Sequence, residues 1–176
     1  MACFDGEPPP EVGSVDLGFF QAEIQPIFDR SCAFTSCHGD PGRAFFVYSM
    51  SKRRIVADEL LGECLTDKEL CVNFSRTAAF VTADPQLSQL LTKPATLDGY
   101  ASQFHEGNYL FGLEDPEALC LARWMQGETL ASSASTAPSL CELPWRAVRA
   151  ARALCPPHVV DCERALRGPD LPEVGG

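Results

Sequence analysis

The apolar and polar positions along the chain predict an amphipathic helix near the start of the sequence. Asp16 precedes the helix and is a suitable N-cap. Apolar side chains then recur at helical spacing at Phe20, Ile24, Ile27 and Phe28. Pro26 lies inside this stripe, and because proline cannot donate a backbone hydrogen bond, we expect the helix to bend or restart there. The pattern predicts that the helix ends near Arg30.

A second helix is predicted between Asp115 and Gly127, and its pattern is the clearest in the chain. Asp115 is expected to cap it, Pro116 suits its first position, and Glu117 suits the positive end of the helix dipole. Its buried face is formed by Ala118, Leu121, Ala122 and Met125. Gly127 favours the end of the helix.

The segments between these two helices have weaker patterns. Short helices are predicted over residues 55–61 and 84–91. Residues 64–71 form a short polar segment, and residues 95–114 are rich in glycine and aromatic side chains. Both segments are therefore predicted to be loops.

The same patterns predict four regions. Residues 1–15 have no periodicity and form an N-terminal tether, and residues 16–128 form one domain. The small polar residues 129–139 are a linker. Residues 140–176 form a cysteine-rich extension with a helix predicted over 144–154. Because so short a segment buries little core by itself, we expect disulfides to hold the extension to the domain.

Composition narrows the classes of function. The chain has 176 residues and a formal net charge of −10, and the whole acidic excess lies in residues 1–139. This charge argues against nucleic-acid binding, which needs a basic surface, and it would steer a basic redox partner toward the domain.

No apolar run reaches the roughly 18 residues of a membrane span. No signal peptide is present, and we expect one to have been removed or trimmed.

Nine cysteines are many for a cytosolic protein and indicate an oxidising compartment. Cys3 is followed by a polar, proline-rich stretch, which is typical of the lipid-bearing cysteine and tether of a bacterial lipoprotein. The alternative is that Cys3 is free or disulfide-bonded.

The stretch Cys32-Ala33-Phe34-Thr35-Ser36-Cys37-His38-Gly39 carries the strongest chemical signal. Two cysteines followed directly by a histidine are typical of c-type haem attachment, although the usual spacer is two residues and this one is four. The two thiols would form thioether bonds to one haem, and His38 would be the proximal ligand of its iron. Gly39 would leave the backbone free to turn away from the haem. The alternatives are a disulfide between Cys32 and Cys37 or half of a zinc site. The apolar run 45–48 lies either near the haem edge or in the core.

Once Cys3, Cys32 and Cys37 are set aside, six cysteines remain as disulfide candidates. They are Cys64, Cys71, Cys120, Cys141, Cys155 and Cys162. Six cysteines allow three disulfides in any of 15 pairings. We expect Cys64 to pair with Cys71 across the short polar loop, and Cys120 to pair with one of the three cysteines of the extension.

Five segments together resemble the cytochrome c domains of planctomycete and myxobacterial lipoproteins. Residues 24–28 and 32–39 resemble the opening of those domains, and residues 84–94 are similar to their "DP-x-x-S-x-L-x-x-KP" segment. His105-Glu106-Gly107 lies where that family often has a histidine-glycine run, and residues 115–127 resemble its closing helix. The resemblance implies an all-α, cytochrome c-like fold around one covalent haem, with long loops and a disulfide-bonded C-terminal helical extension.

The resemblance also implies that His105, in the loop before the closing helix, is the distal iron ligand. Glu106 is the nearest candidate in sequence to hold its other ring nitrogen. The alternatives for the distal position are Met50, Met125, His158 and an open site.

These observations predict an extracytoplasmic monohaem c-type cytochrome that transfers electrons through a six-coordinate iron and is not an enzyme. We expect it in the periplasm or on the outer surface of a Gram-negative bacterium, with a lipid anchor at Cys3 as its membrane contact. Two alternatives remain at this stage. One is a disulfide-rich structural or binding lipoprotein, and the other is a haem enzyme or gas sensor with an open iron site.

Overall fold

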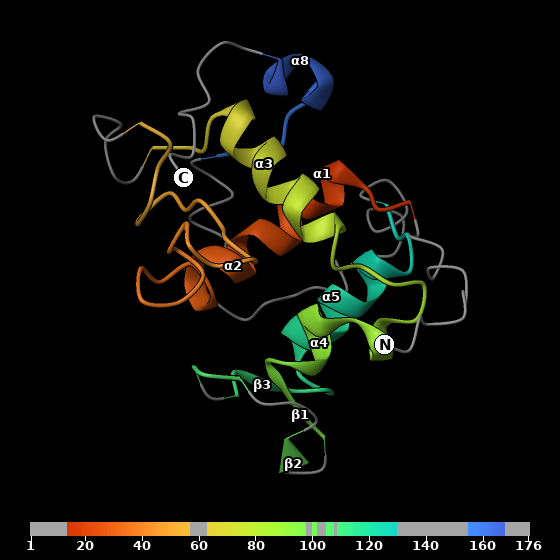
Figure 1. Ribbon diagram of the computed structural model, residues 1–176. Coiled ribbons are helices and arrows are strands. Elements are labelled where there is room, and N and C mark those ends of the chain that lie inside the picture. The colour runs from red at the N-terminus through yellow and green to blue at the C-terminus, as the bar shows by residue number, and fades with distance from the viewer. Residues whose placement is uncertain are drawn as a thin grey trace, which may run out of the picture.

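A computed structural model of the chain describes residues 14–56, 63–97, 100–101, 105–107, 109–129 and 155–167. The described part is mostly helical with little strand (Figure 1), which confirms the helical class at that level. The predicted tether 1–15, the linker 129–139 and the helices predicted over 55–61 and 144–154 lie wholly or largely outside the described residues.

The N-terminal helix is one continuous rod made of three pieces. They are α1 (Leu17–Phe19), the π-helical turn η1 (Phe20–Ile24) and α2 (Gln25–Ser31). Asp16 caps the rod as predicted, because its carboxylate accepts a hydrogen bond from the Phe19 N–H at 2.6 Å. The irregularity predicted at Pro26 takes the form of the π-turn just before it, where the Gln25 N–H bonds to the Phe20 carbonyl five residues back. A widened turn accommodates a position that lacks a donor.

The prediction of a loop over residues 64–71 is wrong, because α3 (Asp67–Ala78) begins within this segment. A capping box starts this helix. The Thr66 hydroxyl accepts from the Glu69 N–H at 3.3 Å, and the Glu69 carboxylate accepts from the Thr66 N–H at 3.0 Å. The sequence signal for the helix was therefore the T-x-x-E spacing, and Leu70 and Cys71 lie on its buried face.

The helix predicted over residues 84–91 is divided into a 3-10 turn, η2 (Pro85–Leu87), and a short helix, α4 (Gln89–Thr92). The predicted closing helix is confirmed as α5 (Pro116–Met125), and Gly127 follows it with a φ of 84°. Asp115 does not cap α5 with its side chain as predicted. Its carboxylate instead accepts from the Gly112 N–H at 2.8 Å.

Residues 95–114 were predicted to be loop, but they contain a small sheet of three strands. The strands are β1 (Ala95–Leu97), β2 (Tyr100–Ala101) and β3 (Phe111–Gly112), in the order β2-β1-β3. β1 pairs antiparallel with β2, with Leu97 opposite Tyr100, and parallel with β3, with Ala95 opposite Phe111. The Leu110 N–H donates to the Pro94 carbonyl at 2.8 Å, which holds the chain before β3 against the segment between α4 and β1.

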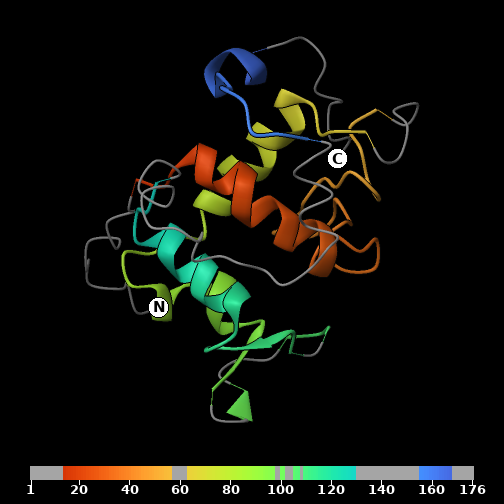
Figure 2. The same cartoon turned by 180° about the vertical axis from the view of Figure 1, so that it is seen from behind.

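The core forms where the N-terminal rod, α3 and α5 pack together. Its largest fully buried side chains include Trp124, Phe19, Phe20, Ile24, Ile27 and Leu121. The Trp124 indole N–H donates to the Asp16 carbonyl at 2.9 Å, which ties α5 to the start of the rod. Figures 1 and 2 show α8 (Cys162–Leu166) beside α3, at the end of the molecule opposite the small sheet.

Two disulfides fasten the extension to the domain, as expected, but the expected Cys64–Cys71 pair is wrong. Cys64 bonds to Cys155, and Cys71 bonds to Cys162. The two cysteines before and within α3 therefore meet two cysteines that have the same spacing in the extension, and α8 packs against α3 at this point. Cys120 is disulfide-bonded as well. Cys141 and Cys3 lie outside the described residues.

Candidate functional site

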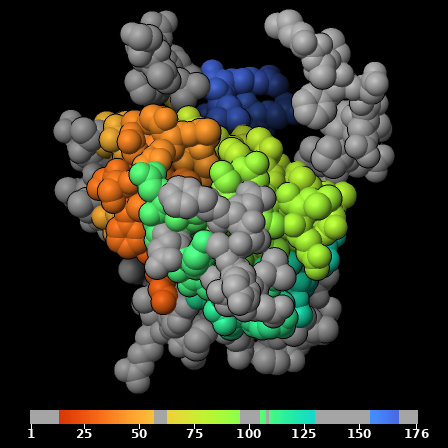
Figure 3. Space-filling model, turned by 60° about the horizontal axis from the view of Figure 1, so that its bottom comes forward, coloured from red at the N-terminus to blue at the C-terminus, as the bar shows by residue number. Residues whose placement is uncertain are grey.

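A cavity of about 380 Å³ brings together the four residues predicted to hold a haem. Cys32, Cys37, His38 and His105 all line it. We call it the histidine cavity. Its other walls come from α2, from Phe45 and Phe80, from α4 and Pro94, from α5, and from Gly107, Leu110 and Phe111. Figure 3 views this side of the molecule, where the green residues 105–112 lie between the orange residues near 30–50 and the lime residues near 80–95.

The segment between the two cysteines folds into a compact bulge. Cys32 ends α2, and its N–H bonds to the Phe28 carbonyl at 3.0 Å. The Phe34 carbonyl then accepts from the N–H groups of Cys37 and Gly39, both at 2.8 Å. Residues 34–36 of the four-residue spacer are exposed, whereas Ala33 is fully buried, and both cysteines line the cavity together with Phe34.

Gly39 is needed because the backbone approaches itself closely at this point. A Cβ atom at residue 39 would lie 2.5 Å from the Ala33 carbonyl oxygen and 2.9 Å from that of Phe34. This reason differs from the predicted one, which was backbone freedom to turn. A side chain here would push the bulge open.

Cys32 and Cys37 carry free thiols, so the structure does not contain the alternative disulfide between them. Burial raises the pKa of Cys32 to about 12, which keeps it a thiol at neutral pH. Within the described residues, no three His, Cys, Asp or Glu side chains form a group suited to a metal ion, so the zinc alternative gains no support.

The environment of His38 fixes its tautomer. Its Nδ1 lies 2.8 Å from the Phe45 carbonyl oxygen. A carbonyl only accepts hydrogen bonds, so Nδ1 carries the proton and the lone pair lies on Nε2. Burial lowers the pKa of His38 and favours the neutral ring. A neutral imidazole anchored through one nitrogen is the form that ligates a metal through the other.

The rings of His38 and His105 lie close to each other with nearly parallel planes. Their centres are 6.0 Å apart, and their planes differ by 28°. A Cβ atom at Gly107 would lie 3.5 Å from His105 Cε1, so the backbone of residue 107 packs against the His105 ring.

The other distal candidates lie elsewhere. Met125 is on the buried face of α5, with 1% of its surface exposed, and does not line the cavity. His158 is hydrogen-bonded to Asp67 at 2.8 Å and to the Gln21 side chain at 3.1 Å. Met50 and His158 line a second cavity, of about 240 Å³, whose lining also includes Gln25, Asp29, Cys64 and Cys155. We call it the sulfur cavity.

Glu106 does not have the role that was expected for it. Its carboxylate forms an ion pair with Arg43 at 2.7 Å, which joins the segment that carries His105 to the loop that follows His38. The pair is exposed, with 43% of the Arg43 side chain and 71% of the Glu106 side chain accessible.

The remaining lining is aromatic and positively charged. Phe45 packs edge-on against His38, with ring centres 4.9 Å apart, and contacts Phe28 and Phe80 at 5.5 Å each. Phe45 lines the cavity, whereas the following Phe46 and Val47 are buried, so the prediction of a core segment is confirmed for residues 46 and 47.

The charged side chains in this lining are Arg43 and Lys93. Sequence reasoning did not assign either residue to the site. The only sequence signal for Lys93 is its place in the segment 84–94.

Comparisons with known proteins do not identify a family. No protein-family model matches the chain, and neither a curated protein nor a solved structure matches it. Among the described helices, none combines the length and the apolar character that crossing a membrane requires. The function is therefore argued from the site itself.

Proposed function

We propose that the chain is a c-type cytochrome that carries single electrons through one covalently bound haem. The observation that supports this most directly is the shared cavity of Cys32, Cys37, His38 and His105, with the two imidazole rings 6.0 Å apart. The proposal assigns thioether attachment to the two free thiols and axial ligation to the two histidines. When bound, the haem would supply an iron centre that alternates between two oxidation states.

The residues of the chain have distinct tasks in this proposal. The Phe45 carbonyl holds the Nδ1 proton of His38 and aims Nε2 at the metal position. The aromatic wall formed by Phe28, Phe45 and Phe80 excludes water from that position. Arg43 and Lys93 are the cations available to the two carboxylates of a haem.

Two histidine ligands favour a lower reduction potential than a histidine–methionine pair, because thioether sulfur stabilises the reduced iron.

The net charge of −10 favours a redox partner with a basic surface. We place the protein in an oxidising compartment, the periplasm or the outer cell surface, because disulfides persist there. A lipid anchor at Cys3 would hold it at the membrane.

Absorption spectroscopy of protein exported through a haem-attachment pathway tests the proposal. The expected result is one haem per chain in the denatured mass spectrum and a low-spin reduced spectrum that carbon monoxide leaves unchanged. Replacing Cys32 and Cys37 together with serine should abolish covalent attachment.

The distal ligand is tested with a matched pair of histidine variants. His105→Ala should convert the iron to a form that binds carbon monoxide rapidly, whereas His158→Ala should keep the low-spin spectrum. If wild-type protein binds carbon monoxide rapidly, the open-site alternative is correct. If exported protein lacks covalent haem, the chain is the disulfide-rich structural or binding protein instead.

A further inference from the structure

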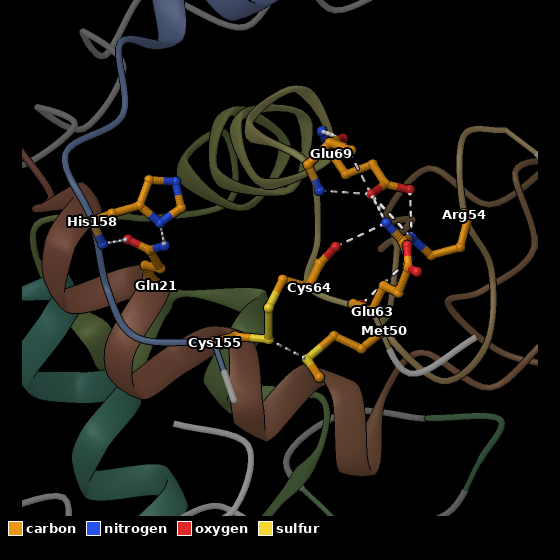
Figure 4. The surroundings of a disulfide bond; sticks show 9 residues. Gln21, Met50, Arg54, Glu63, Cys64, Glu69, Cys155 and His158 are labelled. Carbon is orange, nitrogen blue, oxygen red and sulfur yellow. Dashed lines mark hydrogen bonds and ion pairs between the residues drawn. A yellow bond between two sulfur atoms is a disulfide. The ribbon is translucent and has the colours of Figure 1, made fainter. Parts of the chain in front are cut away.

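Three sulfur atoms meet on the wall of the sulfur cavity. The Cys64–Cys155 disulfide lies beside Met50, whose Sδ is 3.9 Å from Cys155 Sγ (Figure 4). All three residues line the cavity. We propose that reduction of this disulfide creates a binding site for one Cu(I) ion, with two thiolates and one thioether as its ligands.

The spacing of the sulfur atoms suits such an ion. In a planar site with three metal–sulfur bonds of about 2.3 Å, neighbouring sulfurs lie about 4 Å apart. Met50 and Cys155 already have this separation, at 3.9 Å. Breaking the disulfide would leave Cys64 free to move away from Cys155 to the third position. Soft thiolate and thioether ligands select Cu(I) over the harder divalent ions.

Cys64 is anchored independently of its disulfide. The Arg54 guanidinium donates to the Cys64 carbonyl at 3.0 Å and to the Glu63 carbonyl at 3.3 Å. Arg54 is itself fixed by a buried ion pair with Glu69 at 2.8 Å, in which 3% and 0% of the two side chains are exposed. Figure 4 shows these side chains on the Cys64 side of the disulfide. The backbone of Cys64 would therefore keep its place after reduction.

The segment that carries Cys155 is anchored by contacts of His158. The backbone N–H of His158 donates to the Gln21 side-chain oxygen at 3.2 Å, and the imidazole ring of His158 is hydrogen-bonded to Asp67 at 2.8 Å. The second disulfide, Cys71–Cys162, ties the same segment to α3 seven residues further on. Reduction of Cys64–Cys155 alone would therefore leave both thiols beside Met50.

The two disulfides differ in their exposure to a reductant. Cys64 is exposed, whereas Cys71 has none of its surface exposed. A thiolate of a dithiol reductant would attack Cys64 Sγ and break the Sγ–Sγ bond, and Cys155 would leave as a thiolate and take up a proton. The second thiolate of the reductant would then displace Cys64 and close the reductant's own disulfide, so that two electrons have passed to the protein. Binding of Cu(I) would release the two thiol protons and give a site of net charge −1.

A competition assay tests the site in the full chain. Remaining free thiols are first blocked with N-ethylmaleimide, and one equivalent of dithiothreitol is then added without air. Mass spectrometry of the newly exposed thiols should find Cys64 and Cys155 before Cys71 and Cys162. Titration against a chromogenic Cu(I) chelator should show one Cu(I) bound per chain, and X-ray absorption should show three sulfur neighbours.

Two matched methionine variants complete the assay. Met50→Leu should weaken Cu(I) binding at least tenfold and leave two sulfur neighbours. Met125→Leu, which changes a buried methionine on α5, should bind as wild type does. The proposal is overturned if Cys71–Cys162 is reduced first, or if Met50→Leu binds Cu(I) as tightly as Met125→Leu. Neither result depends on whether the histidine cavity holds a haem.

Discussion

The histidine cavity and the sulfur cavity share one wall but are built in different ways. Phe28 and Ser31 of α2 line the first, and Gln25 and Asp29 of the same helix line the second. The histidine cavity takes three of its four key residues from one stretch of seven positions in the sequence. The sulfur cavity is closed by chain segments that are 91 residues apart and joined by a disulfide.

This difference separates local from long-range determinants of a site. Hydrogen bonds within residues 32–39 shape the motif of the histidine cavity, and an exposed ion pair joins it to the segment of His105. The sulfur cavity depends on covalent bonds and on the buried Arg54–Glu69 pair. Variants that disturb one type of contact should therefore affect one cavity much more than the other.

The largest effect is expected from Gly39→Ala in the histidine cavity. The new Cβ would lie 2.5 Å from a backbone oxygen, so the bulge must open. We expect a loss of stability of about 2–3 kcal/mol and little covalent haem, measured by urea unfolding and by mass spectrometry. Gly42→Ala is the control, because its Cβ would meet only the Asp40 side chain, at 3.4 Å. Equal haem loading of the two variants would contradict the role of Gly39.

The next largest effect is expected from the disulfides beside the sulfur cavity. Both bonds span 91 residues, so loop entropy alone predicts the same contribution, about 2–5 kcal/mol each. Cys71 is fully buried, so replacing Cys71 and Cys162 with alanine should cost more than replacing Cys64 and Cys155, because core packing is lost as well.

Urea unfolding of the two double variants measures this difference. The variant without either bond should lose more stability than the sum of the two double variants, since each bond closes only a short loop while the other is intact, and removing both frees the long loop as well. Strict additivity would show that the two crosslinks act independently.

The sequence predicted what depends on local order. The helices that begin after Asp16 and Asp115 have complete apolar stripes, and the structure contains both of them. Cys32, Cys37 and His38 lie within one turn-rich stretch, so the sequence alone indicates that they act together. His105 was added by resemblance, and the structure places it beside His38.

The sequence did not predict what depends on distant contacts. Cys64 and Cys71 are close in sequence, but α3 places Cys71 on a buried helix face where it meets Cys162. The strands in residues 95–112 are only two or three residues long, so they carry no readable alternation. The contact between Met50 and Cys155 follows from the Cys64–Cys155 pairing, and nothing in the sequence indicates it.

A smaller and pH-dependent effect is expected from Asp29→Asn in the sulfur cavity. Burial raises the pKa of Asp29 from 3.8 to about 6, against the opposing effects of Ser49, Gln25 and Lys52. The folded state therefore binds more protons than the unfolded state between pH 4 and 6, and its free energy of unfolding falls as the pH rises through this window.

Asp29→Asn removes the buried charge, so it should stabilise the protein by roughly 1–2 kcal/mol at pH 7.5 and by little at pH 4. Urea unfolding across this range measures the effect. Glu163→Gln, at an exposed position, is the control and should follow wild type at every pH. A stabilisation that is the same at pH 4 and at pH 7.5 would show that the charge of Asp29 is not its cause.

The smallest effect is expected from the Arg43–Glu106 pair of the histidine cavity. The pair is exposed, so salt screens it and unfolding experiments should not detect its loss. The rate of amide hydrogen exchange in residues 105–107 is a more sensitive measure, because the pair joins the segment of His105 to the loop after His38. In wild-type protein this rate should rise with salt toward the rate of Glu106→Gln, and the variant itself should respond little.

Glu114→Gln removes an exposed charge of the same sign, eight positions along the chain, and should keep the wild-type salt response. If Glu106→Gln and Glu114→Gln respond alike, the ion pair does not hold the His105 segment. A salt response in wild-type protein and Glu114→Gln that Glu106→Gln lacks would show that one cavity is closed by a contact that salt weakens, whereas the other is closed by a disulfide that salt does not affect and that only a reductant breaks.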